Sequence, residues 1–242
     1  MSDMRVIRLD TVDSTNTYLH AYRGDEDVVV VTARHQTAGR GQGGNRWEDA
    51  EGQNLLFSIQ IRPVEVAIDH QFVLAMAEAL ALKRALDAYA DGMELKWPND
   101  IYHRDRKLSG TLIETAVSGG RLKRMILGTG INVNQRRFTS DAPNPVSLSQ
   151  ITGSDESIDR LLERILQAFD DYYRRVLEGD YAGISHEYHE ALYRRKGFYR
   201  YRDKDGEFDA ELVGVAYDGR LSLRDSEGRQ RSYAFKEVEF II

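Results

Sequence analysis

KLSGTLIETAVSGGRLKRMILGTGINVN, the stretch Lys107–Asn134, is the most informative part of this 242-residue sequence because it predicts two long neighbouring strands. Both halves are rich in apolar residues, and SGG at positions 118–120 is typical of the turn between them. We therefore expect a β-hairpin. Glycine interrupts each strand, at Gly110 and at Gly128, which indicates either a bulge or the close approach of another group.

Around this hairpin, the spacing of apolar residues predicts further strands and several helices. Strands are expected at 4–10, 28–31, 55–61 and, broken by a turn, 94–103. The run at 28–31 is β-branched throughout and should be buried on both faces, whereas 55–61 alternates as a half-buried strand does. Pro63 should end that strand, and Pro143 should lie in a loop. Helices are expected after residue 14 and at 72–89, 158–176 and 184–195, where the residues follow helical spacing.

The pattern changes after Gly197, where short alternating runs and turn residues predict a small all-β module. A module of roughly 45 residues buries too little to be very stable alone, so we expect it to pack on the larger domain. The sequence thus predicts an α+β protein with a first domain at 1–195 and a C-terminal β domain at 196–242.

Composition limits the class of protein. The chain is 41% hydrophobic and 30% charged, as soluble globular domains are, and no apolar run has membrane-spanning length. It has no cysteine, which excludes disulfides and cysteine-ligated zinc and fits a cytoplasmic protein. The net charge of −6 argues against strong non-specific binding to nucleic acid.

A glycine-rich loop, GRGQGG, follows the buried strand and contains Arg40. It lacks the ending of a Walker loop, and a strand follows it where a dinucleotide-binding motif needs a helix. Its glycines let backbone N–H groups approach an anion, and arginine suits a phosphate or carboxylate. With Trp47 close by, the loop is expected to act as a lid that orders over a ligand. A mobile surface loop is the alternative reading.

Three other motifs are weak when taken singly. KWPNDI at Lys96–Ile101 predicts a turn that either links a hairpin or presents Asn99 and Asp100 to a polar ligand. Lys107 at a strand start is ordinarily just solvated. HEYHE places His186 and His189 three apart, where the zinc-protease motif needs four, so a metal-dependent hydrolase is disfavoured.

Five motifs, which do not include HEYHE, follow one another along the chain in an order that resembles the biotin–protein ligases. The resemblance covers nearly the whole chain and rests on DSTN at 13–16, QTAGRGQGGNRW at 36–47, KWPNDI at 96–101, KLSGTLIE at 107–114 and GTGINVN at 128–134. It implies a mixed, mostly antiparallel sheet with helices, of the class II synthetase and biotin–lipoate ligase type, followed by an SH3-like β-barrel. It also implies the reaction: biotin and ATP, with Mg²⁺, give biotinyl-5′-AMP, and biotin then passes to a lysine of a biotin carboxyl carrier domain.

The resemblance also implies a role for each matched residue. Arg40 and Lys107 would supply catalytic charge, and Asp100 would orient the acceptor lysine. The biotin site would comprise Ser14, Thr15, Asn16, Gln36, Gly39, Arg40, Gly41, Gln42, Trp47, Lys107, Gly110 and Gly128. The ATP site would comprise Arg40, Gln42, Trp47, Asn99, Lys107 and Asn132, with Asn132 also facing Mg²⁺.

Two departures from the family pattern bear on function. The first strand begins near Met4, so the resemblance is to the class without an N-terminal DNA-binding domain, and no DNA or membrane partner is expected. Gln42 stands where some members have a second arginine, which puts tight retention of the adenylate in question. Family members often form homodimers. The alternatives are a lipoate–protein ligase, whose typical loop motif is absent, and a non-catalytic biotin or nucleotide sensor.

Overall fold

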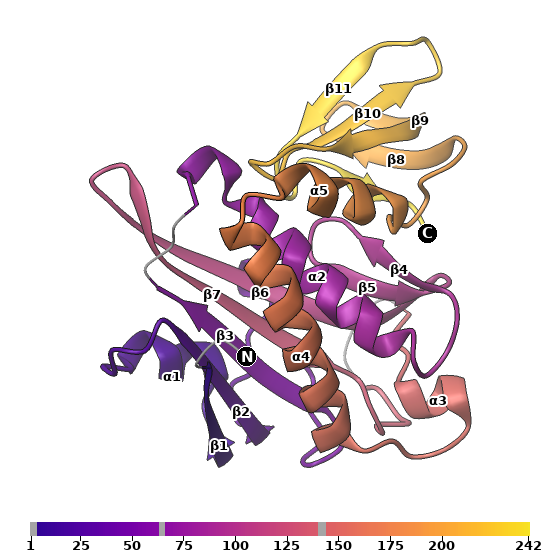
Figure 1. Ribbon diagram of the computed structural model, residues 1–242. Coiled ribbons are helices and arrows are strands. Elements are labelled where there is room, and N and C mark those ends of the chain that lie inside the picture. The colour runs from indigo at the N-terminus through magenta and orange to yellow at the C-terminus, as the bar shows by residue number, and fades with distance from the viewer. Residues whose placement is uncertain (1–3, 63–65, 140–143) are drawn as a thin grey trace.

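The computed structural model describes residues 4–62, 66–139 and 144–242 (Figure 1). The breaks expected at Pro63 and Pro143 lie outside the described residues. Among the described helices, none is both long enough and apolar enough to cross a membrane.

The larger sheet confirms the mixed, mostly antiparallel arrangement. Its strands run in the spatial order β1-β2-β3-β7-β6-β5-β4, and only the β1–β2 pair is parallel. The predicted hairpin forms its centre, because β6 and β7 pair along most of their length. The bounds are β1 Met4–Val12, β2 Val28–Gln36, β3 Leu55–Ile61, β4 Met93–Lys96, β5 Asp100–His103, β6 Arg106–Ser118 and β7 Arg121–Ile131.

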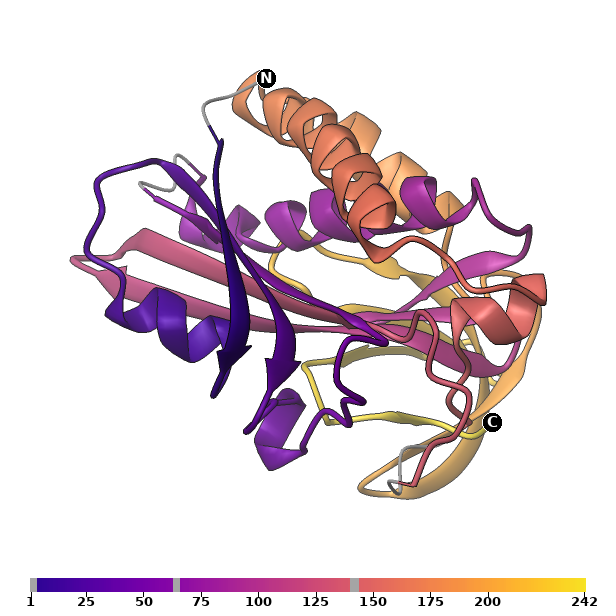
Figure 2. The same cartoon turned by 90° about the horizontal axis from the view of Figure 1, so that it is seen from below.

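Helices cover both faces of this sheet. In Figures 1 and 2, α2, α4 and α5 lie on one face, and the short α1 lies on the other. The bounds are α1 Thr15–Ala21, α2 Phe72–Leu86, α3 Leu148–Thr152, α4 Ile158–Leu177 and α5 Tyr181–Glu190. Helix α5 begins and ends earlier than the predicted 184–195. The short α3, which begins at a capping box on Ser147, was not predicted.

Two sequence-based interpretations need correction. Strand β3 is buried on both faces, although its alternation indicated a half-buried strand. Its polar residues Ser58 and Gln60 lie under α1, beside a small apolar cluster formed by Leu19, Val29, Val31 and Ile126, so their polarity did not mean exposure. The glycines of β7 do not mark a bulge either, because the β6–β7 register shifts at Ala116 and Val117 instead.

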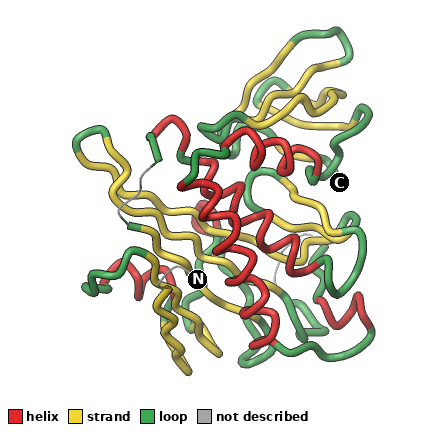
Figure 3. Tube along the Cα trace, in the orientation of Figure 1, coloured by secondary structure: helices red, strands yellow, loops and turns green. Residues whose placement is uncertain are grey.

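The C-terminal sheet has the spatial order β11-β10-β9-β8-β12 and is antiparallel throughout, as expected for an SH3-like module (yellow strands in Figure 3). It packs on the larger part through direct hydrogen bonds. The Trp97 indole donates to the Gly219 carbonyl at 2.9 Å, and the Tyr217 carbonyl accepts from the Phe72 amide at 2.9 Å. The bounds are β8 Tyr199–Asp203, β9 Gly206–Val215, β10 Leu221–Asp225, β11 Gln230–Tyr233 and β12 Glu239–Phe240.

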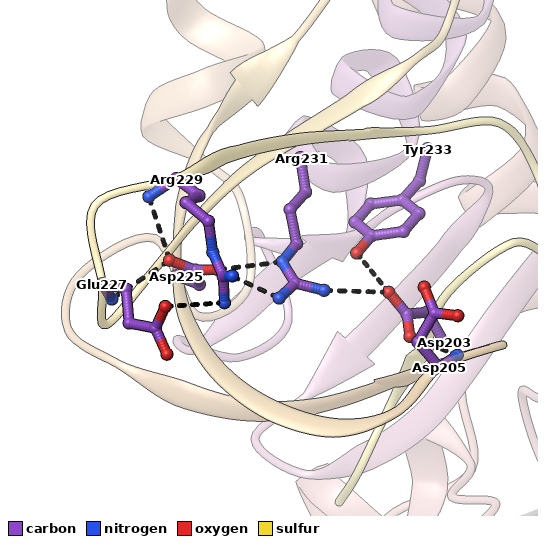
Figure 4. A network of polar contacts seen from close by, with 7 residues as sticks. All are labelled: Asp203, Asp205, Asp225, Glu227, Arg229, Arg231 and Tyr233. Atoms are coloured by element: carbon purple, nitrogen blue, oxygen red, sulfur yellow. Dashed lines mark hydrogen bonds and ion pairs between the residues drawn. The ribbon is translucent and has the colours of Figure 1, made fainter.

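A buried acidic network joins the strands of the C-terminal sheet (Figure 4). Asp225 accepts hydrogen bonds from the Arg229 amide and from the Arg229 and Arg231 guanidinium groups, while Arg231 and Tyr233 also contact Asp203. Burial alone would raise the pKa of Asp225. These hydrogen bonds outweigh burial and lower its pKa to about 2.

This lowered pKa predicts an acid-sensitive contribution to stability. A carboxyl whose folded-state pKa is lowered stabilises the fold above its unfolded pKa, and the contribution is lost as pH falls toward the folded value. Asp225→Asn should therefore lower the melting temperature at pH 7 and flatten its decline between about pH 4 and pH 2. Thermal unfolding across this range tests the prediction, with the exposed Asp209→Asn as control. Equal acid profiles for wild type and Asp225→Asn would contradict it.

Candidate active site

A cavity of about 610 Å³ brings together residues that are far apart in the sequence. The start of α1, the glycine-rich loop, the first half of β6 and the end of β7 form its walls. Of the residues that the sequence predicted for the site, all except Gly39 line it: Ser14, Thr15, Asn16, Gln36, Arg40, Gly41, Gln42, Trp47, Asn99, Asp100, Lys107, Gly110, Gly128 and Asn132. Segments spanning more than a hundred residues of chain thus converge on one cavity.

One wall of the cavity is a connected set of polar side chains. Gln36 Oε1 accepts hydrogen bonds from the Thr15 amide at 2.7 Å and from the Thr15 hydroxyl at 3.0 Å. The Ser58 hydroxyl lies 2.7 Å from Thr15 Oγ1 and 2.6 Å from Asn16 Oδ1, and Asn16 Nδ2 donates to Glu114 at 2.8 Å. Each side chain is therefore held in place before any ligand arrives, as a site that recognises a polar ring requires.

Two glycines of β7 make room for this wall and for the lid. A Cβ atom on Gly128 would overlap the side chain of Asn16, and one on Gly130 would overlap the indole ring of Trp47. Close approach of other side chains therefore explains these glycines. The sequence alone had left either a bulge or such a close approach as the reason for glycine in this strand. The buried Trp47 Nε1 has no hydrogen-bond partner among the described residues, so it is a donor available to a ligand.

The glycine-rich loop folds back on itself above the cavity. The Trp47 amide donates to the Gly39 carbonyl at 3.1 Å, and the Gly41 amide donates to the Asn45 carbonyl at 2.7 Å. Gly39 does not line the cavity, but a Cβ there would come within 3.0 Å of the Trp47 carbonyl. Its part is thus to let the loop close on Trp47. Mobility of the loop without ligand stays a prediction.

Arg40 is held by a carboxylate. Its guanidinium lies 3.0 Å from Glu114 Oε1, and Glu114 also contacts Asn16 and His20. Burial alone would raise the pKa of Glu114, but the hydrogen bonds from Asn16 and His20 and the charge of Arg40 outweigh it and hold that pKa below its usual value. Glu114 is therefore an anion at neutral pH, and an incoming anionic ligand must compete with it for Arg40.

Lys107 and Asp100 form an ion pair at another part of the cavity. Lys107 Nζ lies 2.6 Å from Asp100 Oδ1, and both side chains are largely buried. A Cβ on Gly110 would come within 3.1 Å of both groups, so the glycine keeps this corner open. Asp100 thus contacts Lys107 in this structure, while its part in orienting an acceptor lysine stays a prediction.

The two asparagines of the expected phosphate end are anchored to the sheet. Asn99 Nδ2 donates to the Thr111 carbonyl at 2.5 Å, and Asn132 Nδ2 donates to the Val146 carbonyl at 3.1 Å. Among the described residues, no three His, Asp or Glu side chains are grouped to hold a metal ion. The donor set therefore suits Mg²⁺ only as an ion carried largely by phosphate oxygens and water.

Several residues at the cavity were not predicted from the sequence. Ser58 and Glu114 complete the polar wall, and further lining comes from Asn45, Arg46, Glu48, Thr111, Leu112, Thr129, Gly130, Phe138 and Pro145. Glu114 ends a quoted motif, so its position was marked but its role was not. Ser58 could have been found as a polar residue in an otherwise apolar strand.

A second, wider groove of about 1200 Å³ continues from the cavity to the C-terminal sheet. Gln42, Asn45 and Asn99 line both hollows, so the two communicate. Its walls come from the KWPN turn and from β8, β11 and β12 with their connections, and they carry basic residues such as Arg202, Lys204 and Lys236. A long ligand, or a ligand and a protein partner, can therefore share the combined space.

The comparisons with known proteins agree with this site. Residues 9–132 match the model of the biotin/lipoate A/B protein ligase family. The chain is 30% identical over 239 residues to the bifunctional ligase/repressor BirA of Bacillus spizizenii, which covers 95% of this chain and 72% of that protein. It is also 34% identical over 150 residues to the biotin–[acetyl-CoA-carboxylase] ligase of Mycobacterium tuberculosis, which covers 59% and 53% of the two chains.

A solved structure extends the likeness to the whole chain. The biotin protein ligase from Aquifex aeolicus in complex with biotin and ATP superposes with a TM-score of 0.81 over 97% of both chains, at 26% identity. The likeness includes the C-terminal sheet, since it spans nearly every residue. The resemblance inferred from the ordered motifs is thus confirmed, and the chain belongs to the biotin/lipoate A/B protein ligase family, as one of its biotin–protein ligases.

Proposed function

We propose that this protein joins biotin to ATP and transfers the biotinyl group to a lysine of a biotin carboxyl carrier domain in the cytoplasm. The observation that carries the proposal is that a preformed polar wall and two cationic side chains, Arg40 and Lys107, line one cavity. The biotin carboxylate attacks the α-phosphorus of ATP, and the bond to pyrophosphate breaks. The acceptor amine then attacks the acyl carbon, and AMP leaves.

The polar wall suggests one orientation for biotin in the cavity. Its ureido ring needs both donors and acceptors, which the wall of Ser14, Thr15 and Gln36 provides. The carboxylate then lies toward Lys107, across the floor formed by Gly128 and Gly130. Trp47 closes over the ring system and offers its unpaired indole N–H. This placement supports the biotin roles expected from the motifs.

Catalysis in the first step is chiefly electrostatic. Two anions must meet, and the transition state spreads charge over phosphate oxygens, so fixed cations and N–H donors lower the barrier. Lys107 can contact both anions, and Arg40 and the amides of the glycine-rich loop face the nucleotide. Asn99 and Asn132 would face the phosphates, and Mg²⁺ carried in with ATP would neutralise part of their charge.

The second step needs a neutral acceptor amine, and Asp100 is the carboxylate placed to receive it. When Lys107 turns to the ligand anions, the Asp100 carboxylate becomes free to accept a hydrogen bond from the incoming amine. The groove beside the C-terminal sheet carries both basic and acidic side chains, so it offers charged partners to the nucleotide or to a carrier surface. We accordingly divide the chain into a ligase domain, 1–195, and a cover or docking domain, 196–242.

The central test is adenylate formation. Incubating the protein with biotin, ATP and Mg²⁺ should yield biotinyl-5′-AMP and pyrophosphate, detected by mass spectrometry and a coupled phosphate assay. Adding a carrier domain should give a mass increase of one biotinyl group. If lipoate is activated and biotin is not, the substrate assignment is wrong. Binding of biotin without pyrophosphate release would identify a sensor instead.

A further inference from the structure

Helix α2 carries a buried acid that the reaction above does not use. The Glu78 side chain belongs to a residue that is 2% exposed, and it faces β6 and β7. The Thr129 hydroxyl lies 2.6 Å from Glu78 Oε1, and the Thr111 hydroxyl lies 3.2 Å and 3.4 Å from its two oxygens. The two hydroxyls are 3.0 Å apart. Three side chains from three elements thus form one closed cluster.

Counting protons shows which form of Glu78 completes this cluster. A neutral carboxyl has one O–H donor and one free acceptor oxygen, and each threonine hydroxyl also donates one hydrogen bond. Thr129 can then donate to Glu78, Glu78 to Thr111 and Thr111 to Thr129, so every group donates once and accepts once. An ionised Glu78 has no proton to give. Both hydroxyls then turn to the carboxylate, and the bond between the two threonines is lost.

The surroundings favour the neutral form near physiological pH. Burial raises the pKa of Glu78 to about 7, and the hydrogen bonds from Thr129 and Thr111 offset burial only in part. No charge contributes to this shift. Of the ionisable side chains on the elements packed against α2, most have partners of their own: Lys107 with Asp100, Glu114 with Arg40, Asp170 with Arg174, Glu187 with Arg175, and Lys96 over the Tyr102 and Phe240 rings. Glu94 on β4 and His103 on β5 also belong to these elements.

The cluster lies at the floor of the cavity, which Thr111 and Thr129 help to line, while Glu78 lies behind it. Thr129 stands between Gly128 and Gly130, and side chains alternate along a strand, so its hydroxyl faces α2 while the glycines face the ligand side. Thr111 is tied to Asn99 twice: its amide donates to the Asn99 carbonyl at 2.8 Å, and its carbonyl accepts from Asn99 Nδ2. A shift of either threonine therefore moves the surface that the ligands contact.

We infer that Glu78 is a positioning residue for the ligand cavity, which acts through Thr111 and Thr129 to fix β6, β7 and Asn99 in the geometry that binds biotin. This inference rests on the proposed function, because biotin is the ligand that the floor receives. Glu78 touches no substrate. Its protonated form closes the ring of hydrogen bonds and holds the two strands together, whereas its ionised form opens the ring between Thr111 and Thr129.

Biotin affinity should therefore depend on pH through Glu78. Titration calorimetry with biotin alone, without ATP, measures the dissociation constant at pH 6 and at pH 8.5. For wild type it should rise about fivefold between the two, the effect of losing one hydrogen bond. Glu78→Gln has an acceptor oxygen and two N–H donors at every pH, and one of these donors takes the place of the carboxyl O–H, so it should bind at pH 8.5 as wild type does at pH 6.

Two further variants separate positioning from a general effect on the fold. Thr129→Val keeps the side-chain volume but removes the hydroxyl, so it should bind at both pH values as weakly as wild type does at pH 8.5. Glu94→Gln is the control: Glu94 is a half-buried glutamate on β4 whose pKa is also raised by burial, and it does not line the cavity. It should keep the pH dependence of wild type.

The outcomes are distinct. If wild type and Glu78→Gln show the same change of biotin affinity with pH, or neither shows any, Glu78 does not act as inferred, while the proposed function stands. If no variant and no wild-type protein binds biotin at either pH, the proposed function fails, and this inference fails with it.

Discussion

Lys107→Ala lowers kcat/KM for biotinyl-5′-AMP formation by about 10²–10³-fold, as expected for removal of one preorganised donor to a developing anion. The loss has two sources. The cation proposed to contact the carboxylate and the α-phosphate disappears, and the Asp100 carboxylate, whose Oδ1 lies 2.6 Å from Lys107 Nζ in the wild type, is left unpaired where those anions are proposed to bind. Rates of adenylate formation, followed by pyrophosphate release, measure the effect.

Folding stability should change little in the same variant. The Lys107 side chain is 26% exposed and lies at the cavity, so water can reach the Asp100 carboxylate once the lysine side chain is removed, and the melting temperature should fall by only a few degrees. The exposed Lys123→Ala on β7 serves as control and should keep wild-type rates. Turnover that survives Lys107→Ala would show that the charge of Lys107 is not used in the reaction.

Gly130→Ala weakens biotin binding by about tenfold or more, the usual cost of overpacking at a tight contact. The added Cβ overlaps the Trp47 indole, and Trp47 belongs to a loop that can move more readily than the central strand β7. The loop should therefore open. Calorimetry with biotin gives the affinity, and trypsin cleavage after Arg40 and Arg46, with and without biotin plus ATP, reports whether the loop still closes.

Gly214→Ala in β9 is the matched control, because a Cβ there meets its nearest neighbour, His189 Nε2, at an ordinary 3.4 Å. In a Trp47→Ala background the cost of Gly130→Ala should shrink, since the overlapping ring is gone. Equal losses in both backgrounds would show that Trp47 does not pack on Gly130 when biotin is bound. Equal cleavage with and without ligands would show that the loop does not act as a lid.

Much of the fold was predictable because its strands and helices have strong periodicity. The β6–β7 hairpin, α2 and α4 follow from apolar spacing alone. Strand β3 shows where that reasoning fails: Ser58 and Gln60 alternate with apolar residues, yet both are fully buried, because α1 covers the face that alternation assigned to solvent and receives the Ser58 hydroxyl at Thr15 and Asn16. Alternation shows which residues are polar, and a polar residue can face another polar side chain as well as water.

The site was predictable where residue type is unusual for its position. Glycines inside strands, an arginine in a flexible loop and a lysine three residues before a glycine all indicated a site. The order of the motifs then showed that these residues belong to the same site. Thr111, Thr129 and Glu78 could not be found in this way. Threonine is ordinary in a strand and glutamate is ordinary in a helix, so only the packing of α2 on the sheet shows that their polar atoms meet.

Because Arg40 already contacts the Glu114 carboxylate, an anionic ligand that binds Arg40 replaces one anion with another. In the proposed reaction, Glu114 takes the place of a phosphate as the partner of Arg40, so this half-exposed side chain is already held near the cavity before ATP arrives. The affinity for nucleotide then reflects the difference between two partners of the same guanidinium. A neutral analogue of the nucleotide cannot displace Glu114. Arg40 would then keep its contact with Glu114 and would not contact the analogue.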